Sequence, residues 1–151
     1  MVYNILQHAH SGLRWVVLIL LLAAVWVAVR HLAGRRADYT EGNRKLYLFA
    51  LIATHIQVTG GLLLYLLPAG LGSPKVNFSL AMDKFYRFYT VEHITAMLIA
   101  VVLITIGHSR QKRAADALAK HKQVAIFMGL GLLIILLSIP WPGRVEGAGW
   151  F

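Results

Sequence analysis

The chain contains no cysteine and few acidic residues. Its 151 residues include 6 Asp and Glu against 15 Lys and Arg, and only 14% of them are charged. The absence of cysteine excludes disulfides, thiolate metal sites and covalent attachment of a c-type haem through a C-x-x-C-H sequence. A metal or cofactor would therefore have to be held by His, Glu, Met or Tyr.

Apolar residues dominate the composition. They make up 58% of the chain, and the mean hydropathy of +0.65 lies outside the usual range of a water-soluble domain. The formal charge of +9 would favour nucleic-acid binding in a soluble protein, but the basic residues cluster at the ends of apolar runs, where they set membrane orientation. We predict an integral membrane protein that binds no nucleic acid and whose main partner is the lipid bilayer.

Several apolar segments reach the roughly 20 residues that a spanning helix needs. We place four spans at about 5–32, 43–67, 84–109 and 122–140. The short connections favour an all-α, up-down-up-down four-helix bundle forming one domain over 1–151, with spans one and three, and two and four, diagonally opposite. The first span lacks a basic n-region and contains Arg14, so we expect it to stay in the mature chain.

The connections differ in charge. GRRADYTEGNRK and SRQKRAADALAKHK are strongly basic, which predicts that both lie in the cytoplasm. The segment LPAGLGSPKVNFSLAMDKFYRF is only weakly basic and suits an external loop, and the closing IPWPGRVEGAGWF ends the last helix at two prolines. We therefore expect both termini outside, in a multi-pass membrane protein.

Ionisable groups inside a span are costly and are functional candidates by default. In the outer half of the predicted bundle they are His8, His10, Arg14, His55, Gln57, Glu92 and His93. Arg14 and Glu92 both fall roughly 7 Å outward of their spans' midpoints, which predicts an ion pair between them. That pair would either orient two helices or serve proton transfer or cofactor binding, and Arg14 alone could instead reach an acidic group of a cofactor.

The histidines fall into two groups by depth. His10, His55 and His93 lie on three spans in the outer half or near the centre, and we expect at least two of them to ligate a cofactor. His31 and His108 lie at similar depth near the cytoplasmic side, where interaction with the helix dipole is the simpler explanation. His121 lies within a basic connection and is expected to be solvated.

Haem b suits this set, because a flat apolar macrocycle between helices needs one or two axial nitrogens. For one haem we favour His55 with His93, with His10 as the competing ligand. For two haems the diagonal pairs are His10 with His93 and His31 with His108. A non-haem metal held by the outer His and Glu92 is the alternative, although Glu92 and His93 diverge by about 100° on a helix.

The segments HAHSGLRW, THIQVTGGLLLY, VEHITAMLIAVVLITIGHS and IPWP resemble the small bacterial four-helix membrane proteins labelled cytochrome b-like. The resemblance covers nearly the whole chain and implies a haem-containing or respiratory-chain-associated protein. The positions it implies are His10, Arg14, His55, Gln57, Glu92, His93 and His108. A looser likeness, through QVTGGL, is to half of the haem A synthase fold, whose reaction we do not transfer.

Together these features predict a membrane b-type cytochrome with one or two haems b. It would transfer electrons in or beside a respiratory chain, with quinone as a candidate second cofactor and a quinol or a respiratory complex as partner. The alternatives are a non-catalytic accessory subunit and a carrier of metal ions or protons that uses the outer His and Glu cluster. The sequence leaves open whether the protein is an enzyme by itself and whether it forms a homo-oligomer.

Overall fold

The computed structural model describes residues 2–67, 72–145 and 150, and these form a long helical bundle. The elements are α1 (Val2–Ala33), α2 (Glu41–Leu66), η1 (Phe78–Leu80), α3 (Lys84–Arg87), η2 (Phe88–Glu92), α4 (His93–Arg113), α5 (Ala117–Gln123), η3 (Val124–Met128) and α6 (Gly129–Ser138). Two short π-helical segments, η2 and η3, join their neighbours into single helices over Lys84–Arg113 and Ala117–Ser138. The result is four long helices.

All four helices are long and apolar enough to cross a membrane. The predicted spans of 5–32 and 43–67 agree with α1 and α2 within three residues. The third helix runs further than predicted, to Arg113, and the fourth begins earlier, at Ala117. The reason is that Asp116 caps the fourth helix by accepting a hydrogen bond from the Ala119 amide, so only residues 114–116 remain outside helices here.

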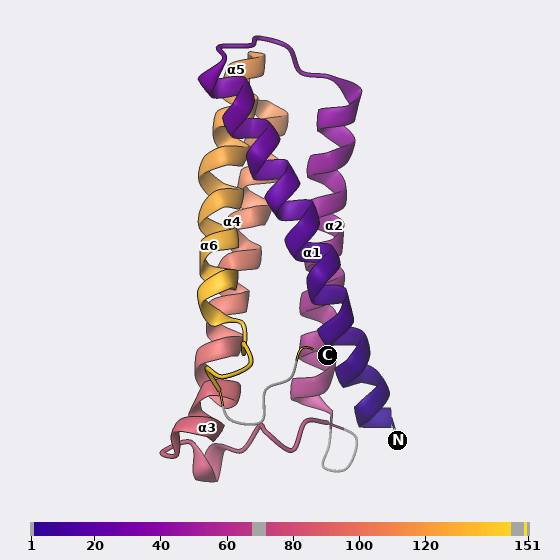
Figure 1. Ribbon diagram of the computed structural model, residues 1–151, viewed down its shortest axis with the longest axis vertical. Coiled ribbons are helices and arrows are strands. Elements are labelled where there is room, and N and C mark those ends of the chain that lie inside the picture. The colour runs from indigo at the N-terminus through magenta and orange to yellow at the C-terminus, as the bar shows by residue number, and fades with distance from the viewer. Residues whose placement is uncertain (1, 68–71, 146–149, 151) are drawn as a thin grey trace.

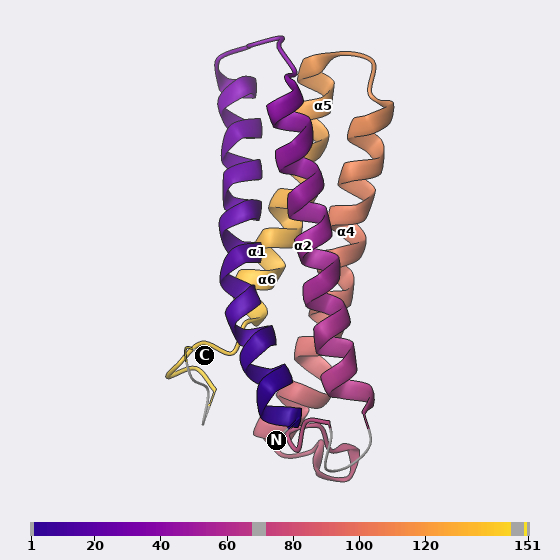
Figure 2. The same ribbon diagram turned by 90° about the vertical axis from the view of Figure 1, so that its right-hand side faces the viewer.

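Figures 1 and 2 show how the helices are arranged. The segment between α1 and α2 and the segment between α4 and α5 lie at one end, which we call the connection end. The N-terminus, α3 and the described C-terminal residues lie at the other, which we call the terminal end. Helix α1 packs against α2 and the α5–α6 helix, and α4 packs against the same two neighbours. Helices α1 and α4 are therefore diagonal in the bundle.

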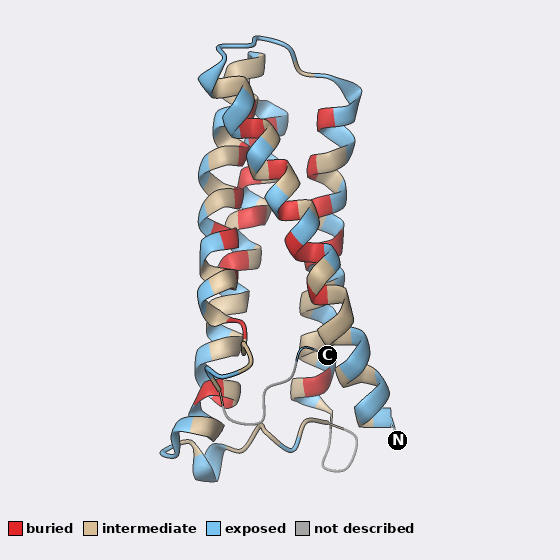
Figure 3. Ribbon diagram, viewed as in Figure 1, coloured by how far each residue is buried: buried red, intermediate tan, exposed pale blue. Residues whose placement is uncertain are grey.

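The buried core lies in the middle of the bundle and toward the connection end, as Figure 3 shows. Small side chains such as Ala24, Ala28 and Ala50 are fully buried beside Leu21 and Ile104. The outward-facing positions carry many exposed Ile, Leu, Val, Phe and Trp side chains. A surface of this kind suits contact with lipid, since a water-soluble bundle would present polar groups there.

Two glycines let α4 lie close to the fourth helix. A Cβ atom at Gly107 would be 2.6 Å from Phe127 Cβ. A Cβ atom at Gly131 would be 2.7 Å from Ile104 Cγ1 and 3.1 Å from the Ala100 carbonyl oxygen. These distances are too short for a methyl group, so glycine is what permits the contact.

We expect Gly131→Ala to destabilise the bundle by about 1–3 kcal/mol, because the added methyl group must push Ile104 or the α4 backbone away. Gly129→Ala is the matched control, since the nearest atom to its Cβ would be Val25 Cγ1 at 3.9 Å. The control should be neutral or more stable by up to about 1 kcal/mol. Thermal unfolding in detergent micelles measures both, and equal midpoints for the two variants would contradict the close contact.

Candidate cofactor-binding site

A cavity of about 170 Å³ lies between the four helices toward the terminal end. Its volume is below the roughly 300–1,000 Å³ of most small-molecule sites, and it has room for on the order of ten water molecules. Its walls are mainly apolar, with Val17, Leu64, Met97 and Ile135 among them. The polar groups that line it are Tyr3, Gln7, His10, Ser11, Arg14, Thr54, Gln57, Tyr65, Ser73, Lys75, Tyr89 and His93.

His10 enters the cavity from α1 and lies against α2. Gly60 and Gly61 make room for its ring, because a Cβ atom at Gly61 would be 3.0 Å from His10 Cε1. The Gln57 amide nitrogen donates to the His10 carbonyl oxygen at 2.9 Å and lies 3.4 Å from Nε2. An amide nitrogen only donates, so a hydrogen bond over that 3.4 Å would have the Nε2 lone pair as its acceptor. Its Nδ1 is buried without a hydrogen-bond partner among the described residues.

His93 enters the same cavity from the first turn of α4. Its Nδ1 donates a hydrogen bond of 2.8 Å to the Ser138 carbonyl oxygen at the end of α6. Because that bond fixes the proton on Nδ1, the lone pair of Nε2 is left for a ligand. His10 and His93 thus bring two imidazole rings from diagonal helices to one cavity.

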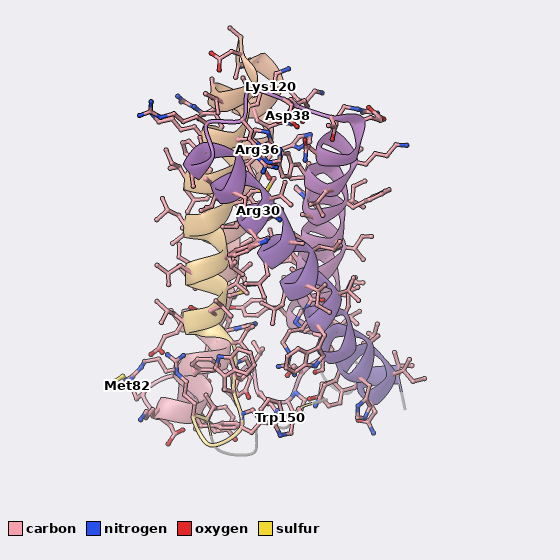
Figure 4. The ribbon with its side chains drawn as sticks, turned by 45° about the horizontal axis from the view of Figure 1, so that its top comes forward. Arg30, Arg36, Asp38, Met82, Lys120 and Trp150 are labelled. Carbon is pink, nitrogen blue, oxygen red and sulfur yellow. The ribbon has the colours of Figure 1, made fainter. Side chains whose placement is uncertain are left out.

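Arg14 also lines this cavity and is buried. Its Nη2 donates to the Trp150 carbonyl oxygen at 2.6 Å, and its guanidinium lies 5.5 Å from the centre of the Trp15 ring. Figure 4 places Trp150 at the terminal end. The predicted ion pair with Glu92 is wrong, because Glu92 is exposed and pairs with Arg87 at 2.8 Å.

The π-helical segment η2 explains why Glu92 does not lie where the sequence predicts it. The prediction assumed an unbroken α-helix through the residues before His93. A π segment adds a residue to the turn and rotates the side chains that follow in register. Thr90 is consequently buried, while Val91 and Glu92 face outward.

His55 lies outside the cavity, although its predicted depth was close to that of His93. Its side chain is exposed, with Nδ1 donating to the Leu51 carbonyl oxygen at 2.9 Å and Nε2 lying 3.4 Å from Thr105 Oγ1. Gln57, two residues later, faces the cavity instead. Two residues differ by about 200° around a helix, so the structure does not bring His55 to the cavity that His93 lines.

His31, which the two-haem alternative pairs with His108, contacts His121 instead. The His31 ring stacks on His121, with centroids 4.2 Å apart and an interplanar angle of 16°. His31 Nδ1 donates to the Val27 carbonyl oxygen at 2.8 Å, and Nε2 lies 3.4 Å from an Asp38 carboxylate oxygen. His108 is half-buried on α4, and its Nδ1 has no partner in the described part of the chain.

His121 is fully buried, which overturns the expectation that it is solvated. Its ring nitrogens lie 2.7 Å from the Tyr47 hydroxyl and 3.0 Å from the Asp38 carbonyl oxygen. The earlier start of the fourth helix at Ala117 moves His121 into the bundle. Figure 4 places Asp38 and Lys120 at this connection end.

A second buried hydrogen bond lies beside this histidine. The Tyr39 hydroxyl donates to Gln111 Oε1 at 2.8 Å, and the Lys120 ammonium lies 4.8 Å from the centre of the Tyr39 ring. Burial raises the pKa of Tyr39, so its hydroxyl stays protonated and can donate. These contacts join the segment before α2 to α4 and α5, and they read as helix packing rather than as a ligand site.

The donor chemistry of the terminal-end cavity fits a haem b. Two imidazole rings from diagonal helices suit axial ligation, and the mainly apolar walls suit a macrocycle. Arg14 offers a cation for the acidic edge of such a group. A small metal ion fits less well, since no group of three or more His, Cys, Asp or Glu able to hold one occurs among the described residues.

The sequence pattern does not single out some residues of this site. Lys75, Tyr65 and Tyr89 line the cavity from the segment after α2 or from the helix ends. Lys75 stands in a region rich in Pro, Gly and aromatic residues that predicts a surface loop, so no periodicity assigns it a direction. Tyr65 and Tyr89 lie at the ends of the predicted spans that flank this loop. Comparisons of the chain with protein-family models, with curated proteins and with solved structures found no match.

We expect Tyr47→Phe to cost about 1–3 kcal/mol of unfolding free energy, because it removes the partner of a ring nitrogen in fully buried His121. Tyr86→Phe serves as control, because no hydrogen bond of the Tyr86 hydroxyl occurs within residues 2–67, 72–145 and 150. Chemical or thermal unfolding in micelles measures both. A Tyr47→Phe protein as stable as the control would contradict a structural role for the hydrogen bond.

Proposed function

We propose that the protein is a multi-pass membrane b-type cytochrome that holds one haem b between His10 and His93 and transfers electrons. The observation that carries this proposal is the meeting of two imidazoles from diagonal helices at one cavity. His93 keeps a lone pair for a ligand through its bond to the Ser138 carbonyl. His10 has only a long contact of 3.4 Å at its Nε2.

Haem b, when bound, supplies a one-electron couple between ferric and ferrous iron. The chain's own residues orient the ligands and exclude water. The carbonyl of Ser138 fixes the His93 ring, Gln57 and Gly61 fix the His10 ring, and the apolar wall keeps the dielectric low. One haem accounts for this arrangement, because His31 is engaged with His121 rather than with His108.

We further propose that the four helices cross the bacterial inner membrane in alternating directions, with the connection end in the cytoplasm. The support is the charge at that end, where Arg30, Arg35, Arg36, Arg44, Lys45, Arg110, Lys112, Arg113, Lys120 and Lys122 gather. Figure 4 shows Arg30, Arg36 and Lys120 at the connection end. The positive-inside rule then puts both termini and the haem cavity on the outer side, where a quinol or a partner protein would exchange electrons with it.

We expect His93→Ala and His10→Ala each to abolish the low-spin haem spectrum, because each removes one axial nitrogen. The exposed His8 and His55 provide matched controls, and His8→Ala and His55→Ala should keep the spectrum. The reduced-minus-oxidised spectrum of purified protein, with the haem-to-protein ratio, gives the answer. Size-exclusion profiles show whether each variant is folded.

Three results would contradict the haem proposal. The first is a wild-type protein that stays without a visible spectrum after incubation with excess hemin. The second is a folded His93→Ala variant with a normal low-spin spectrum. The third is a His55→Ala variant that loses haem while His10→Ala keeps it, which would restore the pairing that the sequence favoured.

The proposed orientation of the helices in the membrane is tested with single introduced cysteines, because the chain itself contains none. We expect a membrane-impermeant maleimide to label Met82→Cys in intact cells and to leave Ala115→Cys unlabelled. Met82 is 93% exposed at the terminal end and Ala115 is exposed at the connection end. Both variants should react after permeabilisation, and labelling of Ala115→Cys alone in intact cells would reverse the orientation.

A further inference from the structure

The cavity is lined by two cationic side chains in addition to the two imidazoles. Arg14 from α1 and Lys75 from the segment after α2 both line it, and no Asp or Glu occurs among the described residues of its wall. Arg14 is only 8% exposed. Its Nε has no hydrogen-bond partner in the described part of the chain. A buried cation is costly unless an anion or a set of acceptors matches it.

The segment that carries Lys75 is joined to η2 by a hydrogen bond two residues after Lys75. The Asn77 backbone amide donates to Thr90 Oγ1 at 3.0 Å, and the Tyr65 hydroxyl of α2 donates to the Thr90 carbonyl oxygen at 2.8 Å. Thr90 is almost fully buried in η2. The segment that carries Lys75 is thus tied to the start of the third helix rather than left loose over the bundle.

The Lys75 ammonium has an aromatic contact and no ion-pair partner within the described residues. Its Nζ lies 4.8 Å from the centre of the Tyr89 ring, which also lines the cavity. Burial lowers the pKa of Lys75, because the partly covered ammonium loses hydration. An anion at this point would offset that loss.

We propose that Arg14 and Lys75 form a two-cation clamp for a ligand that carries carboxylates, so that this cavity selects an acidic amphiphile. The identity of that ligand rests on the proposed function. Under that function the ligand is haem b, and its carboxylates are the two propionates. Lys75 is the new assignment, since nothing in the sequence pattern gave it a direction. It acts as a specificity-determining residue that distinguishes a porphyrin with free carboxylates from one without them.

The chemistry of the clamp is a pair of charge-assisted hydrogen bonds. A guanidinium offers several N–H donors in a fixed plane and suits a carboxylate, while an ammonium acts as a point charge. Both lie in a site with apolar walls, where such bonds are stronger than in water. Esterification of the carboxylates removes their charge and leaves the rest of the macrocycle and its iron unchanged.

The test compares hemin with its dimethyl ester on the full-length haem-free protein in detergent, with Soret absorbance as the readout. We expect the wild type to bind hemin at least about tenfold more tightly than the ester. Lys75→Gln should weaken hemin binding about tenfold and leave ester binding unchanged. Lys75→Arg should restore the preference because it keeps the positive charge. Lys84→Gln is the control, since Lys84 is exposed nearby and does not line the cavity.

The outcomes separate the clamp from the haem proposal. The clamp is overturned if the wild type binds hemin and the ester with equal affinity, or if Lys75→Gln weakens the binding of both equally. In either case, a low-spin spectrum leaves the proposed ligation by His10 and His93 intact. A wild type that gives no His-ligated spectrum with either porphyrin overturns both. If Lys84→Gln weakens hemin binding as much as Lys75→Gln does, the effect is general surface charge and the clamp is overturned.

Discussion

An imidazole between apolar helices needs partners for its ring nitrogens, because an unmatched group there gives up its hydrogen bonds to water and gains nothing in return. The bundle meets this constraint in two ways. His31 and His55 each donate Nδ1 to the carbonyl four residues earlier on their own helix. His93 and His121 are bonded by other elements of the fold. A bond of the second kind requires another element of the fold beside the ring.

A bond to the residue's own helix satisfies the ring without any neighbour. Such a histidine can lie on the outer face of the bundle, and His55 does so. A bond across helices fixes the ring inside and ties its direction to the packing of two elements, as between His93 and Ser138. His10 and His108 follow neither pattern at Nδ1, which in each is buried without a described partner. Of these two, His10 is the one that lines the cavity.

Much of the fold could be predicted from the sequence, because the length and apolarity of a spanning helix leave a strong signal. The four helices were placed within a few residues at most ends. The direction in which a side chain points around its helix is harder to predict, because depth alone puts Glu92 beside Arg14 and His55 beside His93. The π segment η2 turned Glu92 outward, and nothing in an apolar run marks such a segment.

At the connection end, too, the sequence pattern does not reveal which side chains face the interior. His121 was assigned to solvent because basic residues surround it in the sequence. The cap at Asp116 starts the helix early enough to bring His121 inside, against His31 and Tyr47. The stack with His31 joins residues 90 positions apart, and no local pattern reports a contact of that kind.

The two ends of the bundle differ in how their helices are packed. Toward the connection end, Gly107 and Gly131 bring α4 and the fourth helix together, and buried hydrogen bonds around His121 join the helices. Helix α1 runs obliquely across the bundle (Figure 1). Toward the terminal end lies the cavity, which is lined by all four helices. Since close packing resists a change of volume, an end fixed by glycine contacts and buried bonds can keep the helices in register. The other end leaves a cavity, and the segment anchored to Thr90 by Asn77 lines it through Ser73, Lys75 and Val76.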